Sequence, residues 1–287
     1  MKRTYFLAAT AILFWSSVAT VTKLLMGSLT SMQVLSVSSL FAFLFLLCLN
    51  ALTGRLSLLR TYRMRDYLVT VLVGLPGTFL YYMFYYAGAS RLPASQAFII
   101  NYLWPIMSVV FACVILKERM TLRKGIAILL SFFGVMVVMG GSLFGGGGFS
   151  PLGALFCVLG AVSYGVYTAL NSKVSYDKTL SMMFYYGTAC LLSTLIALWQ
   201  GGMPSLTLPT VLGLAYNGIL TMAVASTAWL LALSSGKTAK VSNLAYITPF
   251  LSLVFTALLL REQITLWSIL GLLIIVSGIL IQLKNKK

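Results

Sequence analysis

Few side chains in this sequence could perform acid–base or metal chemistry. The sequence has no histidine and only four acids, which are Asp66, Glu118, Asp177 and Glu262. Its four cysteines stand singly inside apolar segments, without metal-ligand spacing, at Cys48, Cys113, Cys157 and Cys190. The sequence therefore has too few residues of the required types to form acid–base pairs, catalytic triads or zinc sites. We expect no enzyme activity, no metal and no cofactor.

Groups that could bind a small molecule are more abundant, because aromatic and uncharged polar residues recur inside the apolar segments. In the stretch TFLYYMFYY and the residues before it, helical spacing puts Gly74, Thr78, Tyr81 and Tyr85 on one face. An amide group in lipid needs a partner or water, so Asn217 and Asn243 are predicted to face inward. The alternative for each residue is packing or hydrogen bonding between helices. The candidate substrate-binding residues are Trp15, Thr78, Tyr81, Tyr85, Tyr102, Trp104, Tyr164, Asn217, Trp229, Asn243 and Tyr246.

Two prolines interrupt apolar segments in similar contexts, NYLWPIM and AYITPFL. Pro105 and Pro249 cannot donate to the carbonyls of Asn101 and Ala245, so each helix should kink there. A neighbour or water must then satisfy the freed carbonyl. We interpret these prolines as hinges beside a cavity, and Pro76 in GLPG as a third deformable point. A kink that only shapes helix packing remains the alternative.

The elements that carry these residues are predicted to be membrane-spanning helices. Sixty per cent of the 287 residues are hydrophobic and 8% are charged, whereas soluble proteins carry about a quarter charged residues. Apolar runs of roughly 20 residues, each able to cross a hydrocarbon core of about 30 Å, recur along the chain. We expect the first run to be retained and not cleaved as a signal peptide. The ten predicted spans are 4–26, 31–52, 66–88, 94–116, 122–141, 150–172, 179–200, 208–233, 238–260 and 265–283.

The basic residues predict the orientation of these spans. With both ends on one side, 17 of the 20 lysines and arginines lie on that side, and the other side has Lys23, Arg91 and Arg261. Basic loops stay in the cytoplasm, so both termini are predicted to be cytoplasmic. A net charge of +16 would indicate nucleic acid in a soluble protein. Here we expect contact with anionic lipid headgroups and no nucleic acid.

An internal repeat organises the chain. A shift of 144 residues aligns Tyr102–Gly134 with Tyr246–Gly278 without a gap, and 11 of the 33 positions are identical, including Pro105/Pro249 and Glu118/Glu262. The Gly-rich stretch GSLFGGGGFSP reads as a linker between two halves. We predict a first five-helix repeat at 1–142, a linker at 143–150 and a second repeat at 151–287.

Five is an odd number, so the second half must cross the membrane upside down. The loops agree, because KERMTLRK is strongly basic and its repeat partner REQITLWS has lost three of four cations. Inverted repeats are typical of transporters, with the substrate site near the midplane where the halves meet. The predicted fold class is all-α, a polytopic membrane protein of ten helices in a 5+5 inverted repeat.

The pattern of proline, glutamate and threonine at Pro105/Glu118/Thr121 and Pro249/Glu262/Thr265 resembles the drug/metabolite transporter superfamily, and within it the EamA-type ten-helix permeases. NYLWP and the tyrosine-rich third span resemble the bacterial aromatic amino acid exporter branch, in which a tryptophan is expected where this sequence has Tyr164. The resemblance covers the whole chain. It implies export of aromatic and other amino acids and some cationic compounds.

No carboxylate lies near the centre of a predicted span, which favours a cargo without net charge. We expect Glu118 and Glu262 to be structural acids at helix ends, pairing with Arg119 or Arg123 and accepting from the amides that begin the next helix. The predicted function is alternating-access export of aromatic or bulky apolar amino acids, or similar small zwitterionic metabolites, across the bacterial cytoplasmic membrane. The alternative is a drug or cation exporter coupled to protons through one of these acids. The sequence leaves the oligomeric state open and allows a monomer.

Overall fold

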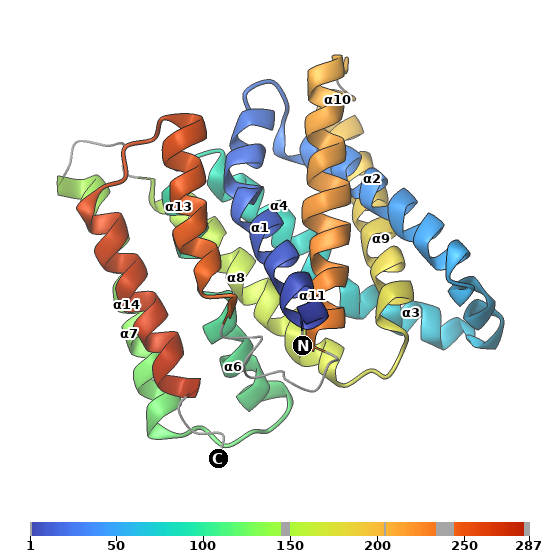
Figure 1. Cartoon of the computed structure of the whole chain (residues 1–287), viewed down its shortest axis with the longest axis horizontal. Helices are drawn as coiled ribbons and strands as arrows, with labels where there is room; N and C mark the ends of the chain where they lie inside the picture. Colours follow the sequence, from blue (N-terminus) through green and yellow to red (C-terminus); the bar gives the residue numbers. More distant parts are fainter. Residues whose placement is uncertain (1, 145–149, 204, 234–243, 284–287) are drawn as a thin grey trace.

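The computed structural model describes residues 2–144, 150–203, 205–233 and 244–283, and every regular element among them is helical. Figure 1 shows these helices as a bundle. The α-helices are α1 (Lys2–Leu25), α2 (Ser31–Leu52), α3 (Met64–Gly74), α4 (Tyr81–Ala89), α5 (Ala94–Asn101), α6 (Trp104–Ile115), α7 (Leu122–Phe144), α8 (Pro151–Ser172), α9 (Lys178–Trp199), α10 (Leu208–Ala215), α11 (Ala225–Leu233), α13 (Ile247–Leu260) and α14 (Leu266–Leu283). The shorter elements are the 3₁₀ helix η1 (Arg55–Thr61) and the π-helical segments η2 (Pro76–Leu80) and η3 (Tyr216–Val224).

The predicted all-helical class is confirmed for the described residues. Eight helical segments are long and apolar enough to cross a membrane, and Ile247–Leu260 and Leu266–Ile281 are two shorter apolar helices. The predicted ninth span starts among residues 234–243 and the predicted linker includes 145–149, so both lie partly outside the described residues. The count of ten spans stays a prediction.

Helix starts follow the local sequence. Thr30 and Gln33 form a capping box at the start of α2, in which each side chain accepts a hydrogen bond from the other residue's backbone N–H. Ser150 accepts from the backbone N–H of Gly153 at the start of α8, and Asp177 accepts from that of Leu180 at the start of α9. These side chains satisfy amides that a helix start would otherwise leave without partners.

One loop contact brings the connection between α8 and α9 onto the start of α3. The hydroxyl of Tyr176 donates to the Asp66 carboxylate at 2.9 Å. This hydrogen bond raises the pKa of the Tyr176 phenol, because the neutral phenol is the donor.

Two spans contain a wide helical turn at matching positions. Pro76 begins η2, and the N–H of Leu80 bonds five residues back to the Leu75 carbonyl at 3.0 Å. Pro76 cannot make its own helical bond, so the turn accommodates an extra residue. η3 interrupts the helix from α10 to α11 in the same way, and it ends at Val224, 144 residues after Leu80.

The two glutamate loops also share one backbone geometry. Lys117 and Arg261 both adopt left-handed conformations, with φ of 57° and 54°. The next residues, Glu118 and Glu262, each bond through the backbone N–H to a carbonyl six residues back at 3.3 Å. This geometry ends a helix and turns the chain sharply. In both loops the glutamate is the residue directly after the left-handed one.

The long helices pack in pairs. α7 lies along α14 at one edge of the bundle and α2 along α9 toward the other, while α1 packs between α11 and α13 (Figure 1). α8 packs against α4 and α6. α1 begins and α14 ends toward the same edge of the view in Figure 1. α4, which begins at Tyr81, packs on α8 of the second half of the chain. α11, which begins at Ala225, packs on α1 of the first half.

Candidate substrate cavity

A cavity lies where α1, α4, α5, α6, α8 and α9 converge. It has a volume of about 80 Å³ and is called the central cavity here. Its lining is mainly aromatic: Trp15, Val18, Gly77, Thr78, Tyr81, Tyr82, Phe98, Asn101, Tyr102, Trp104, Tyr164, Tyr167, Met182, Tyr186, Ser226, Ala245 and Thr248.

A second hollow of about 540 Å³ adjoins the central cavity and is called the vestibule. The two share Trp15, Tyr102, Trp104, Tyr164, Tyr167, Met182, Ser226 and Ala245. The vestibule passes Pro105 and Ser108 and reaches Asn171 and Lys178, where α8 ends and α9 begins. The central cavity therefore adjoins a hollow that reaches that end of the bundle.

Aromatic rings from several spans form the walls of the central cavity and the vestibule. The ring of Tyr164 lies 5.0 Å from that of Tyr81 and 5.1 Å from that of Trp104, measured between centroids. Trp15 and Trp229 face each other at 5.4 Å. Such rings offer apolar faces with partial negative charge, which attract both aromatic groups and ammonium groups.

Charge is confined to the outer end of this space. Among the described residues, those lining the central cavity include no ionisable acid or base other than tyrosine hydroxyls, and Lys178 is the one charged residue that lines the vestibule. Its ammonium group donates to the carbonyls of Asn171 (2.8 Å) and Val174 (2.9 Å) at the end of α8. A charged cargo would find no counter-charge on these walls, so the cavity favours a molecule with no net charge.

The predicted site residues fall into four groups. Trp15, Thr78, Tyr81, Tyr102, Trp104 and Tyr164 line the central cavity. Trp229 and Tyr246 line the vestibule. Asn243 lies outside the described residues, and Tyr85 and Asn217 line neither space.

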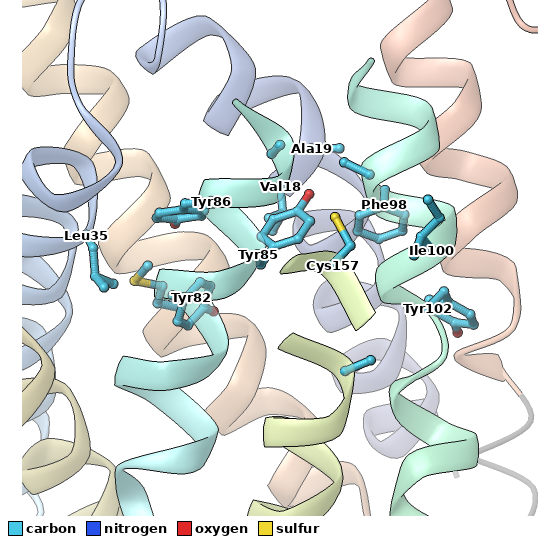
Figure 2. Close-up of a cluster of buried hydrophobic side chains, with 14 of the residues drawn as sticks. Val18, Ala19, Leu35, Tyr82, Tyr85, Tyr86, Phe98, Ile100, Tyr102 and Cys157 are labelled. Atoms are coloured by element: carbon cyan, nitrogen blue, oxygen red, sulfur yellow. The ribbon is translucent and has the colours of Figure 1, made fainter. Parts of the chain in front are cut away.

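Tyr85 is fully buried in the packing between α4 and α8. Figure 2 shows its ring beside Cys157. Tyr81 and Tyr85 share a face of α4, as the spacing predicts, and their rings stack at 6.2 Å. Tyr85 lies one turn beyond the part of α4 that lines the cavity, and the lining uses Tyr81 and the next residue, Tyr82.

Asn217 is also fully buried, and its amide has partners within the bundle. It donates to the hydroxyls of Ser38 at 3.0 Å and Tyr86 at 2.9 Å, while its side-chain oxygen accepts from Thr221 at 2.9 Å. The prediction that it faces inward agrees with this placement. Hydrogen bonding between helices explains the residue without a cargo.

Several polar residues of the lining were missed by the sequence reasoning, among them Asn101, Tyr186, Ser226 and Thr248. Asn101 is 3% exposed and donates to the hydroxyl of Tyr81 at 2.9 Å, and Tyr186 donates to the Met222 carbonyl at 3.2 Å. The rule that an amide in lipid faces inward would have found Asn101. Tyr186 has no comparable signal, because its span is read as an ordinary apolar helix.

The proline positions match breaks in the helices. α5 ends at Asn101 and α6 begins at Trp104, just before Pro105. The carbonyl of Ala245, which Pro249 cannot reach with a donor, accepts from the Tyr102 hydroxyl at 2.5 Å and from the backbone N–H of Thr248 at 3.0 Å. The neighbour required by the sequence argument is thus a tyrosine from the other half of the chain.

Pro76 lies beside the cavity as well. Its carbonyl accepts from the hydroxyl of Ser163 at 2.8 Å. One residue on, a Cβ at Gly77 would enter the ring of Tyr167, so glycine is what allows this ring to lie against the backbone of η2.

The predicted partners of the two glutamates were wrong. Glu118 pairs with Lys124 at 3.0 Å, and not with Arg119 or Arg123. Glu262 accepts from the backbone N–H of Ser95 at 3.0 Å, in the other half of the chain. The amides that begin α7 and α14 instead donate to the hydroxyls of Thr121 and Thr265. Each threonine is closer in sequence to these amides than the glutamate is, so fixing its side chain costs less conformational entropy.

The sequence model of the EamA-like transporter family matches residues 2–140 and matches again over residues 151–283. The chain belongs to the EamA-like transporter family. The predicted resemblance is therefore confirmed, and this EamA-like protein is a membrane transporter, which implies a small-molecule substrate.

Curated relatives of this EamA-like transporter are similar at low identity. The uncharacterized transporter YvbV of Bacillus subtilis (strain 168) is 28% identical over 227 residues, which cover 77% of this chain and 72% of that protein. The aromatic amino acid exporter YddG of Ancylobacter novellus is 26% identical over 188 residues, covering 62% of this chain and 63% of that protein. YddG of Salmonella typhimurium is 26% identical over 190 residues, covering 62% of each. The alignments with the two exporters span less than two thirds of their length.

A solved crystal structure has a similar fold. It superposes with a TM-score of 0.67 over 98% of this chain and 96% of that chain, at 22% identity. The likeness extends the shared helical arrangement to both halves of the sequence.

Proposed function

We propose that this EamA-like transporter exports amino acids with aromatic or bulky apolar side chains, or similar small zwitterionic metabolites, by alternating access. The observation that carries the proposal is an aromatic cavity whose lining, among the described residues, has no charged side chain, and which adjoins the vestibule. A zwitterion has no net charge to neutralise. Its side chain can pack on rings such as Tyr164 and Trp104, and its ammonium group can lie over their faces.

The proposed architecture is the 5+5 inverted repeat, with repeats at 1–142 and 151–287 and a linker at 143–150. It is supported by the two separate family matches, by the glutamate loops of equal geometry and by wide turns that end 144 residues apart. The basic residues support cytoplasmic termini in the bacterial cytoplasmic membrane. Under this topology the vestibule, which reaches the connection between α8 and α9, opens to the cytoplasm.

Alternating access follows from the same arrangement. A cargo would enter through the vestibule, rest against the rings of the central cavity, and leave on the other side after the two halves rock. Pro105 and Pro249 lie where the helices next to the cavity are already interrupted, so bending there costs few hydrogen bonds. No coupling ion is needed for a cargo that moves down its own gradient.

Flux from proteoliposomes tests this proposal. Vesicles loaded with radiolabelled phenylalanine should release it faster than protein-free vesicles, and unlabelled tryptophan or leucine should compete. Phenethylamine and 3-phenylpropionate, which each lack one of the two charges, should compete at least tenfold less well. Absence of protein-dependent flux for phenylalanine, tryptophan, tyrosine and leucine would refute the cargo.

The same vesicles distinguish the proton-coupled drug or cation exporter. That alternative requires flux to respond to a pH gradient and to fall in Glu118→Gln or Glu262→Gln. Neither glutamate lines the central cavity or the vestibule. We therefore expect phenylalanine efflux to be independent of the pH gradient, and a gradient-driven uptake of an organic cation would favour the alternative.

A further inference from the structure

The bundle end opposite the vestibule is closed by one short helix. All eight residues of α5 are buried, from Ala94 at 2% to Asn101 at 3% exposure, which is unusual for a helix of a membrane protein with a lipid-facing side. α5 packs against α1, α4, α7, α8, α13 and α14. A helix surrounded by six others in this way packs inside the bundle, between the central cavity and the surface opposite the vestibule.

The central cavity lies at one end of this helix. Phe98, Asn101 and Tyr102 line the cavity, and the chain then runs past Pro105 along the vestibule. Ser95, near the start of α5, is seven residues before Tyr102, which corresponds to about 10 Å of helix. The start of α5 therefore separates the cavity from the surface opposite the vestibule.

Two charged side chains from other spans hold the chain at the start of α5. The ammonium group of Lys23, near the end of α1, donates to the carbonyls of Ala89 at 2.9 Å and Leu92 at 2.7 Å. The carboxylate of Glu262 accepts from the backbone N–H of Ser95 at 3.0 Å. These three hydrogen bonds all include one charged group, which makes them stronger than bonds between neutral groups.

The two charges also act on each other. The Glu262 carboxylate attracts the Lys23 ammonium group electrostatically. Both side chains are half-buried, where attraction between opposite charges is screened less than at the surface. α1 and the loop before α14 are thus each tied to the segment from Ala89 to Ser95 by the hydrogen bonds of one charged side chain.

The repeat supplies an internal comparison. Glu118 occupies the position equivalent to Glu262 in the repeat. Each glutamate follows a residue in the left-handed conformation, and its backbone N–H donates to the carbonyl six residues back. Its side chain is 53% exposed and pairs with Lys124 six residues on, in the first turn of the next helix, α7. Among the described residues, the acid at the vestibule end therefore contacts the helix that follows it in sequence, whereas the acid at the closed end contacts α5, 167 residues away in the chain.

We propose that Lys23 and Glu262 form a latch that keeps the end of the transporter opposite the vestibule closed. The latch consists of Lys23, Ala89, Leu92, Ser95 and Glu262. It must open for cargo to leave on that side, because α5 can move away from α1 and α14 only when these hydrogen bonds break. The proposal rests on the alternating-access part of the proposed function and is independent of which cargo is carried.

Side-specific labelling of a single cysteine tests the latch. Ser95→Cys, in a protein whose four native cysteines are replaced by alanine, keeps the backbone N–H that Glu262 contacts and places a thiol where exposure is 3%. A membrane-impermeant maleimide is applied from each side of the membrane, without cargo. We expect slow labelling of this reporter from both sides while the latch is intact.

Breaking the latch should raise the rate of maleimide labelling from one side of the membrane. Glu262→Ala or Lys23→Met should accelerate labelling at least tenfold from the side opposite the vestibule. The matched control Glu118→Ala should change it less than twofold. If either latch variant does not fold, Glu262→Gln, which keeps the shape and loses the charge, should still accelerate labelling about threefold.

The proposal is overturned if the latch variants remain monodisperse and label at the rate of the reporter protein, even when their melting temperatures fall. Acceleration from the vestibule side, or an equal acceleration by Glu118→Ala, would also overturn it. Failure of phenylalanine flux would refute the proposed cargo and would leave the labelling result unaffected, so the two proposals can fail separately.

Discussion

Replacing Tyr102 by phenylalanine removes one hydroxyl group from a contact between two distant parts of the chain at the cavity wall. The hydroxyl donates to the carbonyl of Ala245 at 2.5 Å, and Tyr102 is 3% exposed. The ring keeps its neighbours Phe98 and Trp104, whose centroids both lie 6.2 Å away. The substitution therefore removes a hydrogen bond and leaves the aromatic packing in place.

The expected magnitude follows from the partners that remain. A hydrogen bond between neutral groups contributes about 0.5–1.5 kcal/mol, and a buried group left without any partner costs up to about 3 kcal/mol. The Ala245 carbonyl keeps the backbone N–H of Thr248 at 3.0 Å, so the loss should be about 1 kcal/mol. This corresponds to about a fivefold change in the equilibrium between the folded and unfolded protein, or a melting temperature lower by about 2–4 °C.

The assay is thermal unfolding of the purified protein together with phenylalanine efflux from proteoliposomes. Tyr246→Phe is the matched control, because Tyr246 is the repeat counterpart and its hydroxyl has no hydrogen bond to another residue in the described part of the chain. We expect Tyr102→Phe to lower the melting temperature by the stated amount and Tyr246→Phe to leave it within 1 °C. Equal effects of the two substitutions would refute the role assigned to the Tyr102 hydroxyl.

Three further substitutions probe the cavity and a loop. Trp104→Ala should weaken phenylalanine competition about tenfold while the protein stays folded, whereas Trp199→Ala, at a position 86% exposed, should leave competition unchanged; equal competition in both would favour a packing role for Trp104. Gly77→Ala should cost about 1–3 kcal/mol because its methyl group would enter a tyrosine ring, whereas Gly140→Ala, with open space around it, should be neutral or stabilising by up to about 1 kcal/mol; melting curves of both decide the matter. The pKa of Tyr176 is raised in the folded protein, so its contribution to stability is complete below the ordinary value of about 10 and is lost as pH rises through the raised value. Tyr176→Phe should therefore make the melting temperature less sensitive to pH above 10, and an unchanged pH profile would contradict this.

Much of the helical class could be predicted because its signals are local. Apolar runs long enough to span a membrane identify helices without knowledge of their neighbours. The prolines predicted helix breaks for the same reason, since the missing N–H of Pro105 acts within one turn of its own helix. The family followed from motifs at fixed spacing, and the two family matches confirm it.

The candidate site was only partly predictable. Spacing placed Thr78 and Tyr81 on a common face, and both line the cavity. The same spacing placed Tyr85 on this face as well, but Tyr85 lies one helical turn further along α4, where its ring is fully buried beyond the cavity lining. Asn217 was expected to face inward, and its amide bonds to Ser38 and Tyr86 within the bundle, which no periodicity could distinguish from a cargo contact.

The sequence by itself determined that this chain is a helical membrane transporter, because composition, span length and repeat motifs depend on residues near one another in the chain. The tertiary structure decided which groups meet. Tyr102 contacts Ala245 across 143 residues, and Glu262 contacts Ser95 across 167. Such pairs depend on how helices pack and where a helix widens, and neither local spacing nor charge count specifies them.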